Sequence, residues 1–122
     1  MESTMNILIL DDDKWVGQSL TTLFSLDGHS VRHIADPKEV HDFGTRNLDL
    51  LVCDYQFGEV TASFVIQLPG FEDIADRILL SGHLRNELPD EVVDRFSSVV
   101  HKSDFSALRA CVEGLKTRRR VI

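Results

Sequence analysis

An apolar run from Ile7 to Leu10 that stops abruptly in three acidic residues, Asp11, Asp12 and Asp13, most constrains the fold of this chain. Such a run, without polar alternation, is typical of a strand buried on both faces in the middle of a parallel sheet. Three adjacent carboxylates repel one another unless a cation, a helix N-terminus or water separates them. Open α/β sheets bind ligands at the carboxyl ends of their strands. The run therefore predicts a polar site at this end of a sheet.

Composition narrows the class of protein. The 122 residues, of which 43% are hydrophobic, predict one globular domain spanning residues 1–122. A net charge of -7 argues against nucleic acid as a partner and favours a cation or a basic surface. The sequence has no apolar run long enough to span a membrane and no signal core, so we expect a cytoplasmic protein with no membrane partner. Cys53 and Cys111 lack metal-ligand spacing and are expected to be buried, reduced thiols.

Apolar runs alternate with helical periodicities along the rest of the chain, which predicts an α/β fold with a doubly wound, five-stranded parallel sheet and five helices. Asp13, Asp36 and Ser103 are expected to cap the first, second and last helices. The expected strands span about residues 5–10, 30–35, 48–53, 78–80 and 98–100, and the expected helices about 14–26, 36–44, 62–68, 89–96 and 103–120.

The residues at the strand ends form a coherent set. Asp11 to Asp13 follow the first strand, Asp54 the third, Ser81 the fourth and Lys102 the fifth. Carboxylates with one hydroxyl and one ammonium suit a hard cation and a phosphoryl group. A carboxylate can attack phosphorus, while the cation, the lysine and the serine stabilise the phosphoryl oxygens. We therefore expect phosphoryl chemistry at this edge.

Four segments resemble the motifs of the receiver domain of bacterial two-component response regulators, in the family's order and near its spacing. They are Leu8-Ile9-Leu10-Asp11-Asp12, Leu51-Val52-Cys53-Asp54, Ile78-Leu79-Leu80-Ser81-Gly82 and Val99-Val100-His101-Lys102. The resemblance covers nearly the whole chain. It implies the flavodoxin-like (CheY-like) fold and a phosphoacceptor signalling function.

The resemblance implies a role for each strand-end residue. Asp54 is the phosphoacceptor, and the donor is a histidine kinase or phosphotransfer protein. Asp11 and Asp12 hold Mg²⁺ or Mn²⁺ together with Asp54 and the backbone carbonyl of Gln56. Ser81 and Lys102 bind the phosphoryl oxygens.

Further positions and partners follow from the same resemblance. Gly82 leaves room for the donor, and Gln56 and His83 tune dephosphorylation, which together with phosphotransfer is the only turnover expected of this non-enzyme. The resemblance also implies a downstream protein or fused output domain, and a homodimer through the last two helices and last strand. The chain is either a stand-alone receiver or part of a longer regulator.

The chain departs from the family pattern at three places. The segment after Asp54 lacks the usual Met-Pro and Asp-Gly elements. Val99 stands at the switch position, where the family has an aromatic residue, and Ser103 stands where the family has a cis proline. We expect intact phosphorylation chemistry but altered coupling to the face around residues 92–112.

Each residue also has a simpler interpretation, and other functions remain open. Asp13 needs no role beyond the helix cap, and His29, His33, His41 and His101 have no ligand spacing and are expected at the surface or in turns.

One alternative function is a phosphohydrolase of the haloacid dehalogenase kind, with Asp11 as nucleophile. The other is a receiver-like interaction module that works without phosphate. Trp15 is expected near the site, where its fluorescence reports Mg²⁺ binding.

Overall fold

The structure, a computed structural model, describes residues 4–42 and 47–120, of which residues 41, 42, 119 and 120 are described by their backbone alone. Five parallel strands form one sheet in the order β2-β1-β3-β6-β7, which is the flavodoxin-like order. This confirms the predicted doubly wound parallel sheet. The strands are β1 (Asn6–Leu10), β2 (Ser30–Ile34), β3 (Leu50–Asp54), β6 (Asp76–Ser81) and β7 (Ser98–His101).

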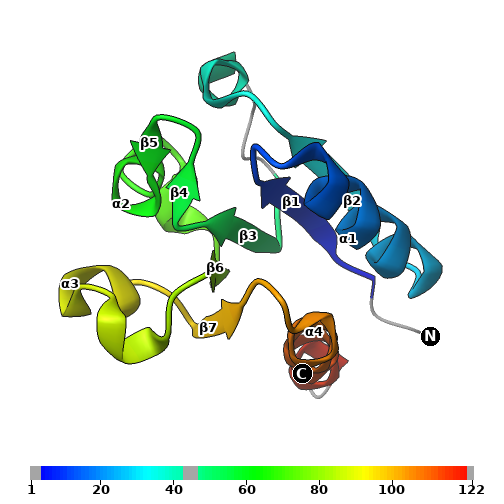
Figure 1. Cartoon of the computed structure of the whole chain (residues 1–122). Helices are drawn as coiled ribbons and strands as arrows, with labels where there is room; N and C mark the ends of the chain where they lie inside the picture. The colour runs from blue at the N-terminus through cyan, green and yellow to red at the C-terminus, as the bar shows by residue number, and fades with distance from the viewer. Residues whose placement is uncertain (1–3, 43–46, 121–122) are drawn as a thin grey trace.

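The two faces of the sheet are covered differently (Figure 1). On one face, helices α1 (Lys14–Leu26) and α4 (Phe105–Arg120) bury Phe24 and Leu108 against Ile7 and Ile9 of β1. Leu8 and Leu10 point to the opposite face, because successive side chains of a strand alternate. That face is covered by short elements: α2 (Ala62–Val65), α3 (Asp90–Val93) and the 3₁₀ helices Pro37–Asp42, Phe71–Asp73 and Arg85–Glu87.

The short elements correct the prediction of five α-helices, because the described residues form only four. The expected second helix is the 3₁₀ helix Pro37–Asp42, capped by Asp36, and the expected end at Gly44 lies outside the described residues. Among residues 37–40, whose side chains the structure describes, only Val40 packs in the hydrophobic core, so little packing stabilises a longer α-helix. None of the helices in the described part of the chain has the length and apolarity to cross a membrane.

Helices α2 and α3 are also shorter than the predicted helices 62–68 and 89–96. Hydrogen bonds of the 3₁₀ type replace their last turns. After α2, Leu68 N–H donates to Val65 O at 3.0 Å, and after α3, Phe96 N–H donates to Val93 O at 3.1 Å. Such bonds satisfy donors where an α-helix cannot continue. Val92, Val93 and Phe96 are nevertheless buried as predicted.

An antiparallel hairpin that the sequence analysis missed follows Asp54. Strand β4 (Gln56–Phe57) pairs with β5 (Val60–Thr61). Gly58 has φ of 60°, as the first central residue of a type II′ turn requires. Each strand has only two residues, too few to show an alternating pattern.

The cap of the last helix also differs from the prediction. Asp104 Oδ1, and not Ser103, accepts the hydrogen bond from Ala107 N–H, at 2.9 Å. At the first helix the prediction is confirmed, because Asp13 Oδ1 accepts from the N–H groups of Trp15 and Val16.

Candidate functional site

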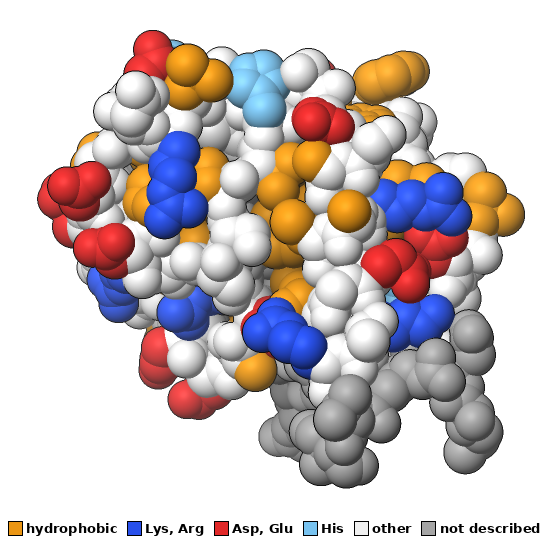
Figure 2. All heavy atoms as spheres, turned by 90° about the horizontal axis from the view of Figure 1, so that it is seen from below, with side chains coloured by type: hydrophobic (Ala, Val, Ile, Leu, Met, Phe, Trp, Pro, Cys, Tyr) orange, Lys and Arg blue, Asp and Glu red, His pale blue; other side chains and the backbone are white. Residues whose placement is uncertain are grey.

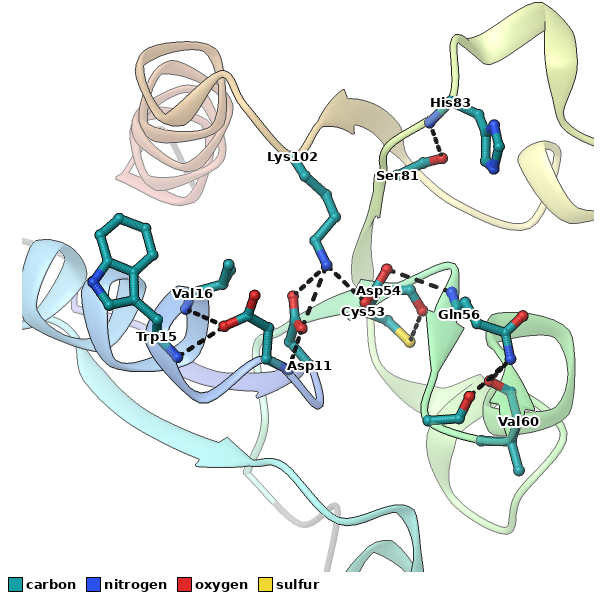
Figure 3. Close-up of polar contacts among 12 residues, drawn as sticks. Asp11, Trp15, Val16, Cys53, Asp54, Gln56, Val60, Ser81, His83 and Lys102 are labelled. Atoms are coloured by element: carbon teal, nitrogen blue, oxygen red, sulfur yellow. Dashed lines mark hydrogen bonds and ion pairs between the residues drawn. The ribbon is translucent and has the colours of Figure 1, made fainter.

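The carboxyl ends of three central strands and the residue after β7 meet at one edge of the sheet, as the sequence predicts. Leu10 pairs with Cys53, and Ser81 pairs with His101, so the strands end at nearly the same level. Asp11, Asp54 and Lys102 point toward one another there (Figure 3). Parallel topology therefore brings together residues that are up to 91 positions apart.

Asp11, Asp54 and Lys102 form a mixed ion-pair cluster. Lys102 Nζ lies 2.8 Å from Asp54 Oδ2 and 3.2 Å from Asp11 Oδ2. The two carboxylates are almost completely buried, while about a quarter of the lysine side chain is exposed, at 26%. One ammonium thus serves two buried carboxylates, which leaves an excess of negative charge.

Burial raises the pKa of Asp54 to about 6. The hydrogen bond and charge of Lys102 oppose this increase, whereas the negative charge of Asp11 adds to it. Burial alone lowers the pKa of Lys102, but its bonds to the two carboxylates outweigh burial, so that its pKa is raised. The cluster therefore attracts additional positive charge, either a proton or a cation.

The acidic residues fit a hard divalent cation. Asp11, Asp12 and Asp54 each place a carboxylate oxygen within 4.8 Å of the others. Asp11 Oδ2 is buried and accepts no hydrogen bond, so its lone pairs are directed only at the charge of Lys102. Carboxylate oxygens in such a set are the ligands that Mg²⁺ prefers. The role of the Gln56 carbonyl as a metal ligand stays a prediction. The backbone N–H of Gln56 donates a long hydrogen bond to Asp54 Oδ1, at 3.4 Å.

The position of Asp11 is held from two sides. Its Oδ1 accepts a hydrogen bond from Asp13 N–H at 2.9 Å. His33 Nε2, from β2, lies 2.8 Å from the backbone oxygen of Asp11 and therefore donates to it. The His33 ring reaches Asp11 across Gly17, where a Cβ would come within 2.0 Å of the ring. His33 is half-buried in the edge strand β2, and the expectation of a surface or turn residue did not include this contact with Asp11.

Ser81 is fully buried at the end of β6, next to β3. Its Oγ accepts a hydrogen bond from His83 N–H at 2.9 Å and is turned toward its own loop (Figure 3). The predicted phosphoryl-binding pair, Ser81 and Lys102, therefore lies on neighbouring strands with only Lys102 on the acidic cluster. Gly82 and His83 are both exposed on this loop, and their roles in donor access and dephosphorylation stay predictions.

Two of the predicted positions have contacts that the sequence did not indicate. The side chain of Gln56 donates to Gly58 O at 2.9 Å, so it is part of the hairpin rather than directed at Asp54. Val99, at the switch position, is half-buried and packs against the core on the side of α3. Trp15 is the second residue of α1 and is 71% exposed, with its ring directed away from Asp11 (Figure 3). Its fluorescence response to Mg²⁺ stays a prediction.

Two further histidines also have contacts that were not foreseen. His29 is buried, and its Nδ1 accepts from Met5 N–H at 3.2 Å. His101 is exposed but makes hydrogen bonds to both loops that flank the site, with Gly82 O and with Ser103. A periodic pattern reveals neither contact, since both join segments far apart in the sequence or loops outside regular elements. Both cysteines are free thiols; Cys53 is buried as predicted, whereas Cys111 is only partly buried.

Comparison with solved structures assigns the fold. The receiver domain of Francisella response regulator 1452 superposes with a TM-score of 0.79 at 24% identity, over 94% of this chain and 98% of that chain. The response regulator TrrA from Thermotoga maritima, in complex with Mg²⁺ and BeF, superposes with a TM-score of 0.75 at 22% identity, over 91% of this chain and 98% of that chain. A two-component response regulator from Clostridium difficile superposes with a TM-score of 0.80 at 15% identity, over 94% of this chain and 98% of that chain. The chain therefore has the fold of response regulator receiver domains. It matches no protein-family model, and no curated protein matches its sequence.

Proposed function

We propose that this chain is a receiver domain that accepts a phosphoryl group on Asp54 in a two-component pathway. The observation that carries the proposal is the convergence of Asp54, Asp11, Asp12 and Lys102 at the carboxyl edge of the sheet. These are the groups that phosphoryl transfer to a carboxylate requires. The donor that we infer is the phosphohistidine of a kinase or phosphotransfer protein.

The chemistry follows from the contacts of Asp54. An ionised Asp54 oxygen attacks phosphorus, the O–P bond forms, the N–P bond of the phosphohistidine breaks, and the leaving imidazole nitrogen takes up a proton. Lys102, which lies 2.8 Å from Asp54 Oδ2, is close enough to shift its hydrogen bonds to the incoming phosphoryl oxygens. The hydroxyl of Ser81, whose oxygen accepts from His83 N–H, would supply a second donor through its own proton.

Asp11, Asp12 and Asp54 would hold Mg²⁺, or Mn²⁺, with the Gln56 carbonyl. The ion would supply positive charge that screens the acidic residues from the phosphoryl oxygens. Asp11 is suited to a structural ligand role, because it is fully buried and held by Asp13 and His33. Asp12, which is exposed, completes the set from the solvent side.

Partners follow from the proposed role. A downstream protein or fused output domain would read the phosphorylated state in the cytoplasm. On the side that shows β7 between α3 and α4, hydrophobic atoms form a central strip between charged groups of both signs (Figure 2). A homodimer through this face remains our prediction. We expect no turnover beyond phosphotransfer and slow autodephosphorylation.

The phosphohydrolase alternative makes Asp11 the nucleophile. Asp11 is less accessible than Asp54, with relative exposures of 0% and 5%, and its Oδ1 is already bonded to Asp13 N–H. This geometry favours Asp54 as the attacking group. The phosphate-independent module makes no use of the ion-pair cluster.

The test is the intact mass of the protein after incubation with Mg²⁺ and acetyl phosphate. We expect a gain of one phosphoryl group in the wild type that disappears in Asp54→Asn. Asp13→Asn is the matched control, because asparagine caps helices as well as aspartate does and Asp13 has no proposed chemical role. An adduct that is lost in Asp11→Asn but persists in Asp54→Asn would favour the phosphohydrolase. The absence of an adduct in every variant would favour the phosphate-independent module.

A further inference from the structure

One peptide group beside the site links two loops. The peptide between Gly82 and His83 offers its oxygen on one side and its N–H on the other, because the six atoms of a trans peptide are planar. His101 Nε2 lies 3.1 Å from Gly82 O, while His83 N–H donates to Ser81 Oγ at 2.9 Å. The orientation of the Ser81 hydroxyl therefore depends on a peptide plane that His101 holds from the far side.

The hydrogen-bond partners of His101 distinguish its two ring nitrogens. Gly82 O can only accept, so Nε2 carries the proton. Ser103 N–H can only donate, so Nδ1 is the acceptor, at 3.2 Å, and it also accepts from Ser103 Oγ–H at 2.7 Å. All three contacts agree on the tautomer with the hydrogen on Nε2. A continuous hydrogen-bond chain thus runs from Ser103 through His101 and the Gly82–His83 peptide to Ser81 Oγ.

The chain of bonds depends on the residue that follows Lys102. A proline at position 103 would have neither an N–H nor a hydroxyl to hold the imidazole ring. With Ser103, both groups are present and both bind His101. His101 directly precedes Lys102, whose N–H donates to Ser81 O at 2.9 Å, so the same two loops are joined at the backbone as well.

We propose that His101 is a positioning residue that orients the Ser81 hydroxyl for phosphoryl binding, through the Gly82–His83 peptide. This role rests on the proposed phosphoacceptor function. Because His83 N–H occupies one lone pair of Ser81 Oγ, the hydroxyl proton is left to donate to a phosphoryl oxygen. Orienting a donor before the reaction lowers the cost of arranging it in the transition state.

The test is a double-mutant cycle on the rate of phosphorylation by acetyl phosphate at saturating Mg²⁺, followed by intact mass. His101→Leu removes the donor to Gly82 O and should slow the reaction by about tenfold, the equivalent of one hydrogen bond. His101→Gln, the matched control, keeps an N–H donor with similar reach and should stay within about threefold of the wild type. In a Ser81→Ala background, His101→Leu should have no further effect, because no hydroxyl remains to be oriented.

Each outcome decides the matter. An equal slowing with and without Ser81 would overturn the role, since His101 would then act on the structure as a whole, and so would an unchanged rate in His101→Leu. If His101→Leu does not fold by circular dichroism, Ser103→Ala takes its place in the cycle, because it removes only the 2.7 Å contact to Nδ1. A wild-type protein that gains no phosphoryl group refutes the proposed function and this role with it. A normal wild-type gain without coupling between His101 and Ser81 refutes this role alone.

Discussion

The two halves of the site are stabilised in different ways. The acid half, Asp11, Asp12, Asp54 and Lys102, has three carboxylates near one ammonium. The hydroxyl half, Ser81, Gly82, His83 and His101, is joined by hydrogen bonds between neutral groups whose donors and acceptors match. The acid half has an excess of negative charge that folding alone does not neutralise, whereas the hydroxyl half has its bonds in place.

This difference predicts different responses to the same perturbation. Added cations, protons or a phosphoryl group change the free energy of the acid half directly, because they neutralise or replace charge. The hydroxyl half carries no excess charge, so the geometry of its hydrogen bonds depends on the positions of its backbone groups. Charge substitutions should therefore alter stability and metal affinity, and substitutions in the hydroxyl half should alter the rate of phosphoryl transfer.

Removal of Lys102 should have the largest effect. In Lys102→Met the two buried carboxylates lose their common partner, so the free energy of unfolding without metal should fall by about 3 kcal/mol. Mg²⁺ should restore most of the loss and bind at least as tightly as to the wild type, while phosphorylation fails. Urea unfolding in EDTA and in Mg²⁺ measures this, with exposed Lys14→Met as control. An equal loss of Mg²⁺ binding and phosphorylation would contradict the assigned role of Lys102.

The bracing of Asp11 by His33 should matter next. In Gly17→Ala the new Cβ would clash with the His33 ring, and relieving this overlap should cost about 2 kcal/mol and weaken Mg²⁺ binding. The control is Gly114→Ala on α4, where a Cβ meets nothing within 4 Å and should stabilise the helix by up to about 1 kcal/mol. Thermal unfolding compares the two. Similar melting temperatures for both variants would show that the acid half does not depend on this brace.

A pH dependence should follow from Asp54 and be smaller. Its pKa in the folded protein is about 6, above the ordinary aspartate value of 3.8, so the folded state binds a proton more tightly than the unfolded chain does. The resulting stability is fully present below the unfolded value and is lost as the pH rises through about 6. In EDTA, Asp54→Asn should therefore gain stability over the wild type at about pH 7.5 but much less at about pH 5. A gain of the same size at both pH values would contradict this.

Ser81→Ala should have the smallest effect on stability, and it tests the other half. The variant loses one acceptor for the exposed loop residue His83, so the free energy of unfolding should change by less than about 1 kcal/mol. Mg²⁺ affinity should stay that of the wild type, while phosphorylation by acetyl phosphate slows. Isothermal titration with Mg²⁺ separates the two quantities. A marked loss of Mg²⁺ affinity would show that the two halves are not independent.

The sequence predicted the features that depend on burial along single strands and on the cap of the first helix. The apolar runs before Asp11, Asp54 and Ser81 end where the strands end, and parallel topology then places these residues together. Helix α1 begins at Lys14 and ends at Leu26 as predicted, because Asp13 caps it and its apolar face is regular.

Features that depend on contacts between distant segments could not be predicted. The contact of His33 with Asp11 needs the pairing of β2 with β1, and the contact of His101 with Gly82 needs the pairing of β7 with β6. The two-residue strands after Asp54 lack the length for a periodic signal, although Gly58 marks their turn. The cap was misplaced from Asp104 to Ser103 because both residue types cap helices, and only the contact with His101 distinguishes them.

The packing of the His33 ring on Gly17 has a consequence for how this chain can vary among relatives. Any side chain at position 17 occupies the space of the imidazole, so the two positions cannot accept substitutions independently. A relative with alanine or serine at the position of Gly17 should carry a smaller residue than histidine at the position of His33. Such a relative would also lack the hydrogen bond that His33 donates to the Asp11 carbonyl. Substitutions at position 17 of α1 should therefore occur together with loss of this support for Asp11.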